Sequence, residues 1–419
     1  MSNSRGARRR ILIGVGGGIA AYKVCSVIRH YTEAGHEVRV VPTRSALRFV
    51  GAATFEALSG HPVSTEVFDD VDEVAHVRLG QEADLVIIAP ATADLMSRAA
   101  AGRADDLLTA SLLTARCPVL FVPAMHTEMW EHPATAANVE TLRRHGATVM
   151  TPASGRLTGT DSGAGRLPDP QEIALLGELL LEQADALPHD LSGLRFVISA
   201  GGTRESIDPV RFLGNHSSGK QGFALARVAA QRGARVTLVA GSTSDPGDPA
   251  GVDIVRVGDA RELADEMTKR AAESDVVIMA AAVADFRPLA VADAKIKKGA
   301  DGPAPIELTT NPDILRGLVQ ARDAGDIPAS TVIVGFAAET GDETGGVLDH
   351  GRTKLTRKGC DLLVVNAVGD GKAFGTEDNA GWLLSAQGSE TALPLGSKTL
   401  MSSRILDEVR TLVPDNRQP

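Results

Sequence analysis

Short apolar runs that end at glycine or proline alternate with stretches of helical periodicity along most of the chain. The run at residues 10–15 leads into a glycine-rich turn, a predicted helix over residues 19–35 and a second strand at residues 36–41. A strand, a helix and a strand in this order form a βαβ unit. Further strands, each closed by a proline, are predicted at residues 84–89 and 118–122. The first half is therefore predicted to be an α/β domain.

A second domain start lies in the middle of the chain, in the stretch VISAGGTRESIDPVRFLGNHSSGKQG at residues 197–222. An apolar strand reaches a glycine pair, a polar loop follows, and residues 223–232 have a helical pattern. The preceding segment, residues 168–190, has helical periodicity and then a proline, which is typical of a boundary. We therefore predict two α/β domains with parallel sheets, over residues 1–187 and 188–419.

Composition narrows the class of protein. Hydrophobic residues make up 43% of the 419 residues but aromatic residues only 3%, so the cores are expected to be aliphatic. The net charge of −10 disfavours nucleic acid as a partner. The three cysteines are too widely spaced for a disulfide framework. Apolar runs are too short for a signal peptide or a membrane span, so we expect a soluble, cytoplasmic protein.

The glycine-rich turn after the first strand is a candidate anion site. Its glycines let the backbone turn sharply and approach a ligand, and the N–H groups at the start of the next helix can hold an anion. A tight turn that binds no ligand is the alternative reading. The candidate residues are Gly16, Gly17 and Gly18.

The end of the second strand decides which nucleotide suits this turn. A dinucleotide fold uses an acidic residue there for a ribose hydroxyl, whereas this chain has two hydroxyl groups and an arginine. Hydroxyls and a cation suit a phosphate, so a mononucleotide such as FMN is favoured over NAD. Ligands collect at the carboxyl ends of parallel strands. The residues expected there are Thr43, Ser45, Ala91 and Thr92.

Three segments of the first half (GGGIAAYK; APATADL with GRADDLLT; PAMHTEMW) resemble the flavin-containing cysteine decarboxylases, in particular phosphopantothenoylcysteine decarboxylase. The resemblance covers residues 10–170. It implies a Rossmann-like, flavodoxin-like FMN domain that assembles as trimers, oxidises the substrate thiol to ease loss of CO₂, and then reduces the ene-thiol product. His76 matches the family's catalytic histidine, which can accept a proton. Without the resemblance it is interpreted as a packing residue.

The chain departs from this family at two positions. The family's carboxylate-binding asparagine is replaced by His126, which can still donate a hydrogen bond. In the family's substrate clamp a cysteine donates the last proton, and the corresponding residue here is Gly159. Thr158, Thr160, Asp161 or a water molecule are the alternative donors. The predicted clamp residues are Gly159, Thr160, Asp161 and Arg166.

The second half carries a near match to a phosphate-binding P-loop, GNHSSGKQ. A P-loop requires serine or threonine after the lysine, but Gln221 stands there, so we reject that reading. The strand at residues 235–239 lacks a terminal acid, which disfavours NAD in this half as well. Lysines 295, 297 and 298 follow Asp285 and are interpreted as an anion clamp, with a solvated lysine surface as the alternative.

Five ordered motifs of the second half (AGGTRE with DPVRF and NHSSGKQG; AAAVADF-R; KIKK; NPDI; GFAAET) resemble phosphopantothenate–cysteine ligase over residues 190–410. The resemblance implies that CTP activates a carboxylate as an acyl-cytidylate, which the amine of cysteine then attacks. Such chemistry requires dense positive charge and positioned donors. Arg211 and Asn215 would hold the acyl-cytidylate, and Lys295 would neutralise charge. Residues implied to bind CTP are Ala281, Asp285, Asn311, Pro312, Asp313, Ile314, Phe336, Lys354 and Lys358.

The whole chain resembles the bifunctional proteins of coenzyme A biosynthesis, in which this ligase is fused behind the decarboxylase. The resemblance implies Mg²⁺ with CTP, although no ligand cluster marks its site, and a homo-oligomer built from ligase dimers and flavin-domain trimers. Two other readings stay open at this point. The flavin domain could be a regulatory binding module, because the clamp cysteine is absent. The glycine loops could belong to an NAD(P) dehydrogenase, although both second strands lack the acid.

Overall fold

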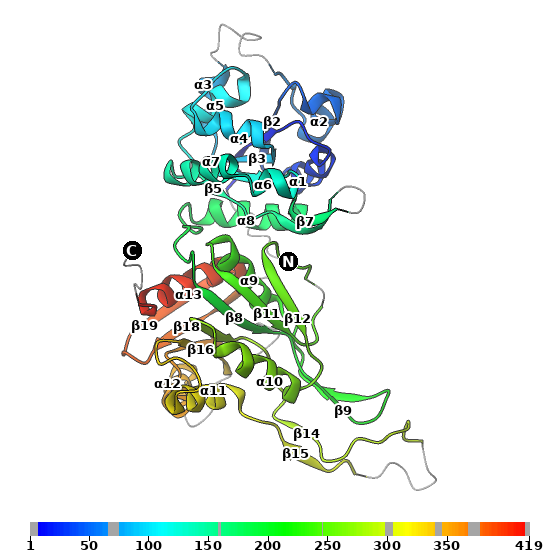
Figure 1. The fold of residues 1–419 in the computed structure, drawn as a ribbon, viewed down its shortest axis with the longest axis vertical. Coiled ribbons are helices and arrows are strands. Elements are labelled where there is room, and N and C mark those ends of the chain that lie inside the picture. Colours follow the sequence, from blue (N-terminus) through cyan, green and yellow to red (C-terminus); the bar gives the residue numbers. More distant parts are fainter. Residues whose placement is uncertain are drawn as a thin grey trace. The chain divides into compact units, whose positions relative to one another are not determined.

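A computed structural model describes residues 7–65, 75–157, 161–244, 246–297, 305–339, 346–367 and 378–414. The contacts divide the chain into two compact units (Figure 1). Unit 1 comprises residues 1–189 and 249–251, and unit 2 comprises residues 190–248 and 252–419. No helix within these described ranges is both long enough and apolar enough to cross a membrane.

Unit 1 is built on a parallel sheet whose strand order explains where a ligand can bind. In the described residues the order is β2-β1-β3-β4-β5, which is the flavodoxin-like order. The order reverses between β1 and β3, so the loops after these strands meet at one crevice. The strands are β1 (Arg10–Val15), β2 (Glu37–Pro42), β3 (Leu85–Ala91), β4 (Val119–Pro123) and β5 (Thr148–Val149).

Helices cover both faces of this sheet because its strands alternate apolar residues between the two sides. Leu12 and Ile88 pack into one core with α4, α5 and α7. On the other side α1 and α8 pack together, where the Tyr31 hydroxyl donates to the carbonyl of Ala174 at 3.1 Å. The helices are α1 (Ala21–Glu33), α2 (Ala52–Ser59), α3 (Ala75–Glu82), α4 (Ala93–Ala100), α5 (Leu107–Thr114), α6 (Thr127–Trp130), α7 (Pro133–Arg144) and α8 (Pro170–Glu182), with a 3₁₀ turn, η1 (Ala46–Arg48).

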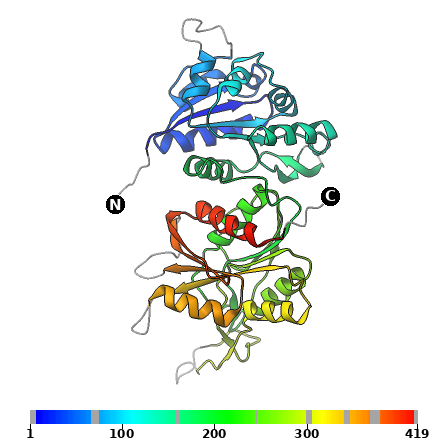
Figure 2. The ribbon, with the colours of Figure 1, turned by 90° about the vertical axis from the view of Figure 1, so that its left-hand side faces the viewer.

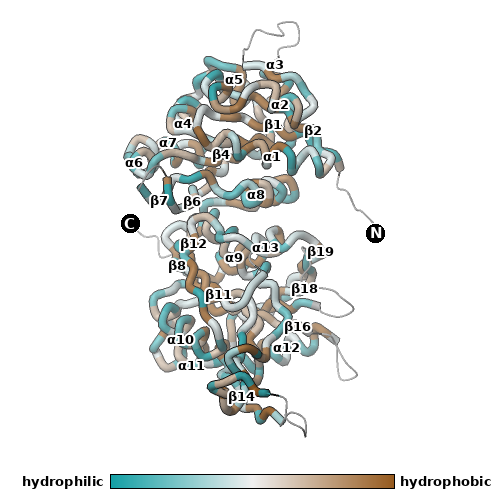
Figure 3. Tube along the Cα trace, turned by 90° about the vertical axis from the view of Figure 1, so that its right-hand side faces the viewer, coloured by the Kyte–Doolittle hydropathy of each residue, from teal (hydrophilic) through white to brown (hydrophobic). Residues whose placement is uncertain are grey.

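Unit 2 has a larger sheet with the order β12-β11-β8-β13-β16-β17-β18-β19 in the described residues. The first six are parallel and the last two antiparallel. Numbered from β8, the parallel strands have the Rossmann order 3-2-1-4-5-6. Figure 3 shows hydrophobic residues along the central strands. The strands are β8 (Arg195–Ala200), β11 (Arg235–Ala240), β12 (Val252–Arg256), β13 (Val276–Met279), β16 (Val332–Glu339), β17 (Leu362–Ala367), β18 (Asp378–Ser385) and β19 (Glu390–Ser397).

Helices of unit 2 also lie on both faces. One face packs with α10, α11 and α12 in a core that contains Val197, Leu318 and Leu363. The other face carries α9, with α13 beside it (Figure 2). The helices are α9 (Lys220–Gln231), α10 (Ala260–Ala271), α11 (Ile314–Ala324), α12 (Val347–Lys358) and α13 (Lys398–Leu412).

A buried arginine ties α13 to the start of unit 2. The Arg232 side chain is 1% exposed and donates to both carboxylate oxygens of Asp190 at 3.0 and 2.8 Å and to Asp407 at 2.6 Å. Removal of one partner from such a buried charge pair is costly, so this contact fixes α13 on the fold.

Three two-stranded ribbons complete the fold of the described residues. In unit 1, β6 (Ala153–Arg156) pairs with β7 (Ser162–Arg166). In unit 2, β9 (Arg204–Ser206) pairs with β10 (Phe212–Gly214), and β14 (Phe286–Pro288) pairs with β15 (Leu308–Thr310). Figure 1 shows β9 and the β14–β15 pair together, away from the large sheet.

Candidate active sites

The glycine turn of unit 1 lies at the carboxyl edge of the sheet, where three loops meet. A Cβ at Gly16 would collide with the carbonyl oxygen of Pro90, and one at Gly17 would collide with the Ser45 side chain. The Gly16 amide also donates to Pro90 O at 3.2 Å. These glycines are therefore required for the loops after β1, β2 and β3 to approach one another.

The polar groups around this crevice suit an anion. Helix α1 begins there with no side-chain cap and no acidic residue in its first turn, so no carboxylate of that turn competes with an anion at the helix N-terminus. Thr43 is buried, and its Oγ1 accepts from the amide of Ala46 at 3.2 Å. Thr92 caps α4 by accepting from the amide of Leu95 at 3.3 Å. The predicted residues of this loop cluster are thus brought to one edge.

The β6–β7 hairpin is attached to the loop that carries His126. The Met125 amide donates to the carbonyl of Gly165 at 2.9 Å, and Thr127 Oγ1 donates to the carbonyl of Ala164 at 2.8 Å. A Cβ at Gly163 or Gly165 would collide with this loop, which accounts for the glycine pattern of the predicted clamp.

The predicted clamp is described only in part. His126, Asp161 and Arg166 are exposed. The Asp161 carbonyl accepts from the Leu157 amide at 2.8 Å and closes the hairpin. Positions 158–160, with the predicted clamp residues Gly159 and Thr160, lie outside the described residues.

His76 lies on α3, which packs on α5. Its carbonyl accepts from Thr114 Oγ1 at 2.8 Å. Its Nδ1 atom is buried and has no hydrogen-bond partner among the described residues. A buried, unsatisfied ring nitrogen is unfavourable unless another group meets it. This position is compatible with a proton-transfer group that is completed by a ligand or a second subunit.

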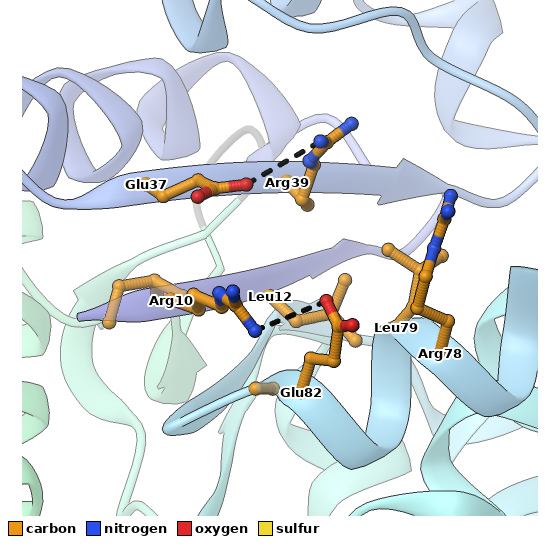
Figure 4. Close-up of a pocket in the computed structure, with 9 residues that line it drawn as sticks. Arg10, Leu12, Glu37, Arg39, Arg78, Leu79 and Glu82 are labelled. Atoms are coloured by element: carbon orange, nitrogen blue, oxygen red, sulfur yellow. Dashed lines mark hydrogen bonds and ion pairs between the residues drawn. The ribbon is translucent and has the colours of Figure 1, made fainter.

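A small cavity of about 40 Å³ lies at the opposite edge of this sheet, at the amino ends of β1 and β2 (Figure 4). It holds space for little more than one water molecule. Its charged groups pair with each other, since Arg10 contacts Glu82 at 3.2 Å and Arg39 contacts Glu37 at 3.4 Å. The cavity shares no residue with the predicted site, and we assign it no ligand.

The second candidate site is a cleft of about 720 Å³ at the carboxyl edge of the large sheet. It lies at the point where the strand order reverses between β8 and β13, which is the usual ligand position in such folds. Its volume is in the range of small-molecule sites. The predicted residues that line it are Asn215, Ala281, Asp285, Asn311, Pro312, Asp313, Ile314, Phe336, Lys354 and Lys358.

Asn215 enters the cleft from the polar loop before α9. Its Nδ2 donates to the carbonyl of Val283 at 3.1 Å and lies 3.5 Å from that of Ala282. Gly219 has a left-handed φ of 77° and a Cβ there would collide with Thr243, so this loop requires glycine. The loop after β8 and the loop after β13 are thereby held face to face.

Asp313 and Lys358 join two walls of the cleft. Asp313 caps α11 by accepting from the Arg316 amide at 3.2 Å, and it pairs with Lys358 at 2.5 Å. Burial works against ionisation, but the hydrogen bond from Lys358 lowers the pKa of Asp313 below its usual value. The cleft remains rich in cations, since Lys220, Lys354, Arg357, Lys358 and Lys398 line it against two aspartates.

Sequence reasoning missed several polar residues of this cleft, among them Asn366, Asn379, Gln221 and Lys398. Asn366, at the end of β17, has a buried Oδ1 with no hydrogen-bond partner in the described structure. Asn379 Nδ2 lies 3.4 Å from Gln221 Oε1, and Gln221 donates to Ser402 at 3.0 Å. Lys398 is buried at the start of α13. For Asn366, its position at the end of a strand was the only feature of the sequence that could have indicated a site. Gln221, Asn379 and Lys398 come from segments far apart in the sequence, and no motif of the sequence connects them.

Two predicted catalytic residues do not line the cleft. Arg211 lies at the tip of the β9–β10 hairpin, where its guanidinium pairs with Asp208. Lys295 is exposed on the loop after β14. Lys298, the last lysine of the predicted anion clamp, lies outside the described residues. No group of three or more metal-binding histidine, cysteine, aspartate or glutamate side chains occurs in the part of the chain that the structure describes.

Comparisons with known proteins agree over the whole chain. A family described as "DNA/pantothenate metabolism flavoprotein C-terminal domain" matches residues 191–412, and one described as "Flavoprotein" matches residues 2–176. Coenzyme A biosynthesis bifunctional protein CoaBC of Mycobacterium tuberculosis is 67% identical over 405 residues, which are 97% of each chain. Its counterpart in Vibrio vulnificus is 42% identical over 411 residues, 97% of this chain and 98% of that one.

Among solved structures, the C-terminal domain of a CoaBC protein is 34% identical and covers 54% of this chain and all of its own, with a TM-score of 0.44.

Proposed function

Because this chain belongs to the family of bifunctional coenzyme A biosynthesis proteins, we propose that it carries out two successive reactions. Unit 2 joins cysteine to 4'-phosphopantothenate with CTP, and unit 1 converts the resulting phosphopantothenoylcysteine to 4'-phosphopantetheine with FMN. The observation that carries the ligase assignment is the cation-rich cleft at the strand-order reversal of unit 2. A triphosphate requires such positive charge, and the cleft has the volume for a nucleotide.

In the ligase reaction, a carboxylate oxygen of phosphopantothenate attacks the α-phosphorus of CTP, and pyrophosphate leaves. The amine of cysteine then attacks the acyl carbon, and CMP leaves. Asn215 lines the cleft and holds the acyl-cytidylate by polarising its carbonyl group. Arg211 also holds the acyl-cytidylate, and Lys295 neutralises the negative charge that develops during attack.

The residues that line the cleft support distinct roles in binding CTP. Phe336 is half-buried and offers a face for the base, while Asn311 is fixed by its Nδ2, which donates to the carbonyl of Ala284 at 2.8 Å. Lys354 and Lys358 line the cleft and supply cations for the phosphate groups. Mg²⁺ is expected to bind through the triphosphate oxygens, because the described residues supply no cluster of their own.

The glycine crevice of unit 1 fits FMN. Its uncapped helix start, hydroxyl groups and tightly packed glycines suit a phosphate and its ribityl chain. Gly16, Gly17, Gly18, Thr43, Ser45, Ala91 and Thr92 would hold it. Bound flavin supplies two-electron redox chemistry at the substrate thiol. His76 accepts a proton from the substrate, and His126 and Arg166 hold its carboxylate.

The last proton transfer is the step at which this chain departs from the family's pattern, because Gly159 replaces the family's cysteine. Thr158, Thr160, Asp161 or water then serves as the donor. This replacement also favours a second candidate for unit 1, a flavin-binding module with a regulatory role. To separate the two, the protein is mixed with phosphopantothenoylcysteine while product and flavin absorbance are followed. Release of CO₂ with formation of 4'-phosphopantetheine supports the enzyme, and binding without turnover supports the module.

Exposed apolar side chains support the proposed oligomer. A set on the β9–β10 and β14–β15 ribbons fits dimerisation through unit 2: Val210, Phe212, Phe286, Leu289, Val291, Ile296, Ile306 and Leu308. A smaller set near the glycine crevice fits trimerisation through unit 1: Ile19, Tyr22 and Phe49. Mass measurement in solution tests both, because dimers and trimers together produce a closed assembly of more than three chains.

The ligase assignment is tested by nucleotide choice. The protein is incubated with phosphopantothenate and Mg²⁺ and with each of the four common nucleoside triphosphates in turn, and pyrophosphate release is measured. Release with CTP well above the others supports the proposal. Equal pyrophosphate release with all four nucleotides would contradict the preference for CTP. No pyrophosphate release with any of them would contradict the formation of an acyl-nucleotide.

A further inference from the structure

The tip of the β9–β10 hairpin is organised by one buried carboxylate, that of Asp208. Its side chain is completely shielded from solvent. Oδ1 accepts hydrogen bonds from the backbone amides of Val210 at 2.9 Å and Arg211 at 2.8 Å. An aspartate that bonds the amides two and three residues ahead closes a tight turn. The backbone that presents Arg211 is therefore set by Asp208.

The second oxygen of this carboxylate reaches a different part of the chain, the loop of residues 292–297. Oδ2 accepts from the amide of Ile296 at 3.1 Å and from the Arg211 guanidinium, whose Nε lies at 2.9 Å. Arg211 Nη2 donates further to the carbonyl of Ile296 at 2.9 Å. The Ala292 amide donates to the carbonyl of Ile207 at 3.0 Å. Lys295 thus lies between Ala292 and Ile296, the two residues through which its loop is hydrogen-bonded to the hairpin.

These hydrogen bonds require an ionised aspartate at position 208. The hydrogen bond from Arg211, helped by the three backbone amides, holds the pKa of Asp208 well below its usual range. The group is therefore an acceptor on both oxygens at neutral pH. An asparagine of the same shape would keep one acceptor oxygen, but its NH₂ group could not accept from Arg211 or Ile296.

We propose that Asp208 is a positioning residue for the ligase reaction, which brings the Arg211 guanidinium and the Lys295 loop to one surface. This inference rests on the proposed function, because the roles of Arg211 and Lys295 belong to it. The nucleotide cleft is held by other contacts, such as that between Asp313 and Lys358. Loss of Asp208 should therefore slow turnover without weakening CTP binding.

The first test compares Asp208→Asn with Asp293→Asn. Asp293 is an exposed aspartate of the same loop, so its variant makes the same charge change without removing the hydrogen bonds between the loop and the hairpin. Asp208→Asn is expected to lower kcat of ligation by about 10- to 100-fold, since small misplacements of catalytic groups cost that much. Its KM for CTP should stay within about twofold, and Asp293→Asn should match the wild type. An unchanged kcat, or a loss confined to KM, would overturn the inference.

A second measurement does not depend on activity. Trypsin cleavage after Lys295, followed by mass spectrometry of the full-length protein, should be several-fold faster in Asp208→Asn than in the wild type and in Asp293→Asn. Equal rates would mean that the carboxylate does not hold the loop. If the wild-type protein makes no phosphopantothenoylcysteine, the proposed function fails, but this comparison still reports on the hydrogen bonds between the loop and the hairpin.

A double substitution asks through which residue Asp208 acts. In a Lys295→Gln background, Asp208→Asn should lower kcat by a clearly smaller factor than it does in the wild type, because one of the two groups that it positions is already gone. Full multiplication of the two losses would contradict the inference. Should Asp208→Asn fail to fold, Ile296→Pro removes the loop's amide donor, together with the isoleucine side chain, and leaves the buried carboxylate in place. It is then expected to lower kcat with KM unchanged, and a wild-type kcat would overturn the proposal.

Discussion

Gly16 and Gly18, two glycines of the loop after β1, differ in the contacts that an added Cβ atom would make. A Cβ at Gly16 would collide with the Pro90 carbonyl, which is backbone and cannot move away without shifting the loop. A Cβ at Gly18 would lie 3.8 Å from the Pro90 and Thr92 side chains, at ordinary contact distance. The run of glycines in the sequence indicated close approach, but not which glycine is essential, because that depends on the packing of three separate loops.

Gly16→Ala is therefore expected to destabilise unit 1 by about 1–3 kcal/mol, the usual cost of overpacking. Gly18→Ala is the matched control for stability, and its effect should stay within about 0.5 kcal/mol. Urea unfolding of the full-length protein, followed by flavin fluorescence, measures both. Equal effects of the two substitutions would show that the Pro90 contact does not limit the loop.

Asn366 is the residue of the cleft that most requires a ligand. Asn366 lines the cleft, and its Oδ1 is buried and lacks a hydrogen-bond partner among the described residues. A buried acceptor without a donor costs about 1–3 kcal/mol, so a ligand N–H group that meets it recovers this free energy. Sequence could place Asn366 at a strand end, but not its missing partner, which is a property of the folded surroundings.

Asn366→Ala is accordingly expected to raise KM for CTP by about tenfold, the equivalent of one lost hydrogen bond to a ligand. Gln320→Ala, an exposed amide on α11, is the control and should leave KM unchanged. Steady-state pyrophosphate release at varied CTP gives both values. A normal KM in Asn366→Ala would place the nucleotide elsewhere in the cleft.

At the scale of elements, hydrophobic patterning located most of the main strands to within one or two residues, but it did not indicate β12 at the edge of the large sheet. The strand predicted at residues 118–122, for example, is β4 (Val119–Pro123). Patterning could not predict the order of strands, because order depends on which helix crosses which face. The short ribbons β9–β10 and β14–β15 were also missed, since neither alternates apolar and polar residues over enough length. Those ribbons present Arg211 and the loop of Lys295.

Helix α5 offers a pH-dependent prediction at this scale. Asp106 caps it by accepting from the Thr109 amide at 2.8 Å and pairs with Arg98 at 2.7 Å. Burial opposes ionisation, but the hydrogen bonds from Arg98 and Thr109 outweigh it and lower the pKa of Asp106. A lowered folded-state pKa stabilises the fold above the unfolded-state pKa, and that stabilisation is lost as pH falls through the folded-state value.

Asp106→Asn keeps a good capping residue but loses the charge, so it should destabilise unit 1 by about 1 kcal/mol at pH 7. The difference from the wild type should shrink as pH falls below about 4, where the wild-type carboxyl gains its proton. Urea unfolding at several pH values measures this difference. A gap that stays constant down to pH 3 would show that the charge of Asp106 does not contribute.

At the scale of the whole molecule, the chain combines two doubly wound sheets with different strand orders, and each candidate ligand site lies at a reversal point of its sheet. The resemblance to a decarboxylase in one half and a ligase in the other agrees with the family matches over residues 2–176 and 191–412. The exposed apolar ribbons of unit 2 could not be predicted from composition, because the same residue types also fill the cores.

If each unit catalyses its own reaction, a substitution in one unit should leave the activity of the other unit unchanged. Lys295→Gln is expected to slow ligation by at least about tenfold and to leave decarboxylation of added phosphopantothenoylcysteine unchanged. His76→Asn should have the reverse effect and still bind flavin. Parallel assays of both half-reactions on both variants provide the measurement. Loss of both activities from either substitution would contradict independent sites.

The most direct test of the whole account is one incubation of the purified full-length protein with 4'-phosphopantothenate, cysteine, CTP and Mg²⁺. Mass spectrometry of the products should find CMP, pyrophosphate, phosphopantothenoylcysteine and then 4'-phosphopantetheine. Accumulation of phosphopantothenoylcysteine without 4'-phosphopantetheine would confine the activity to unit 2. Absence of both products, with CTP unconsumed, would contradict the account.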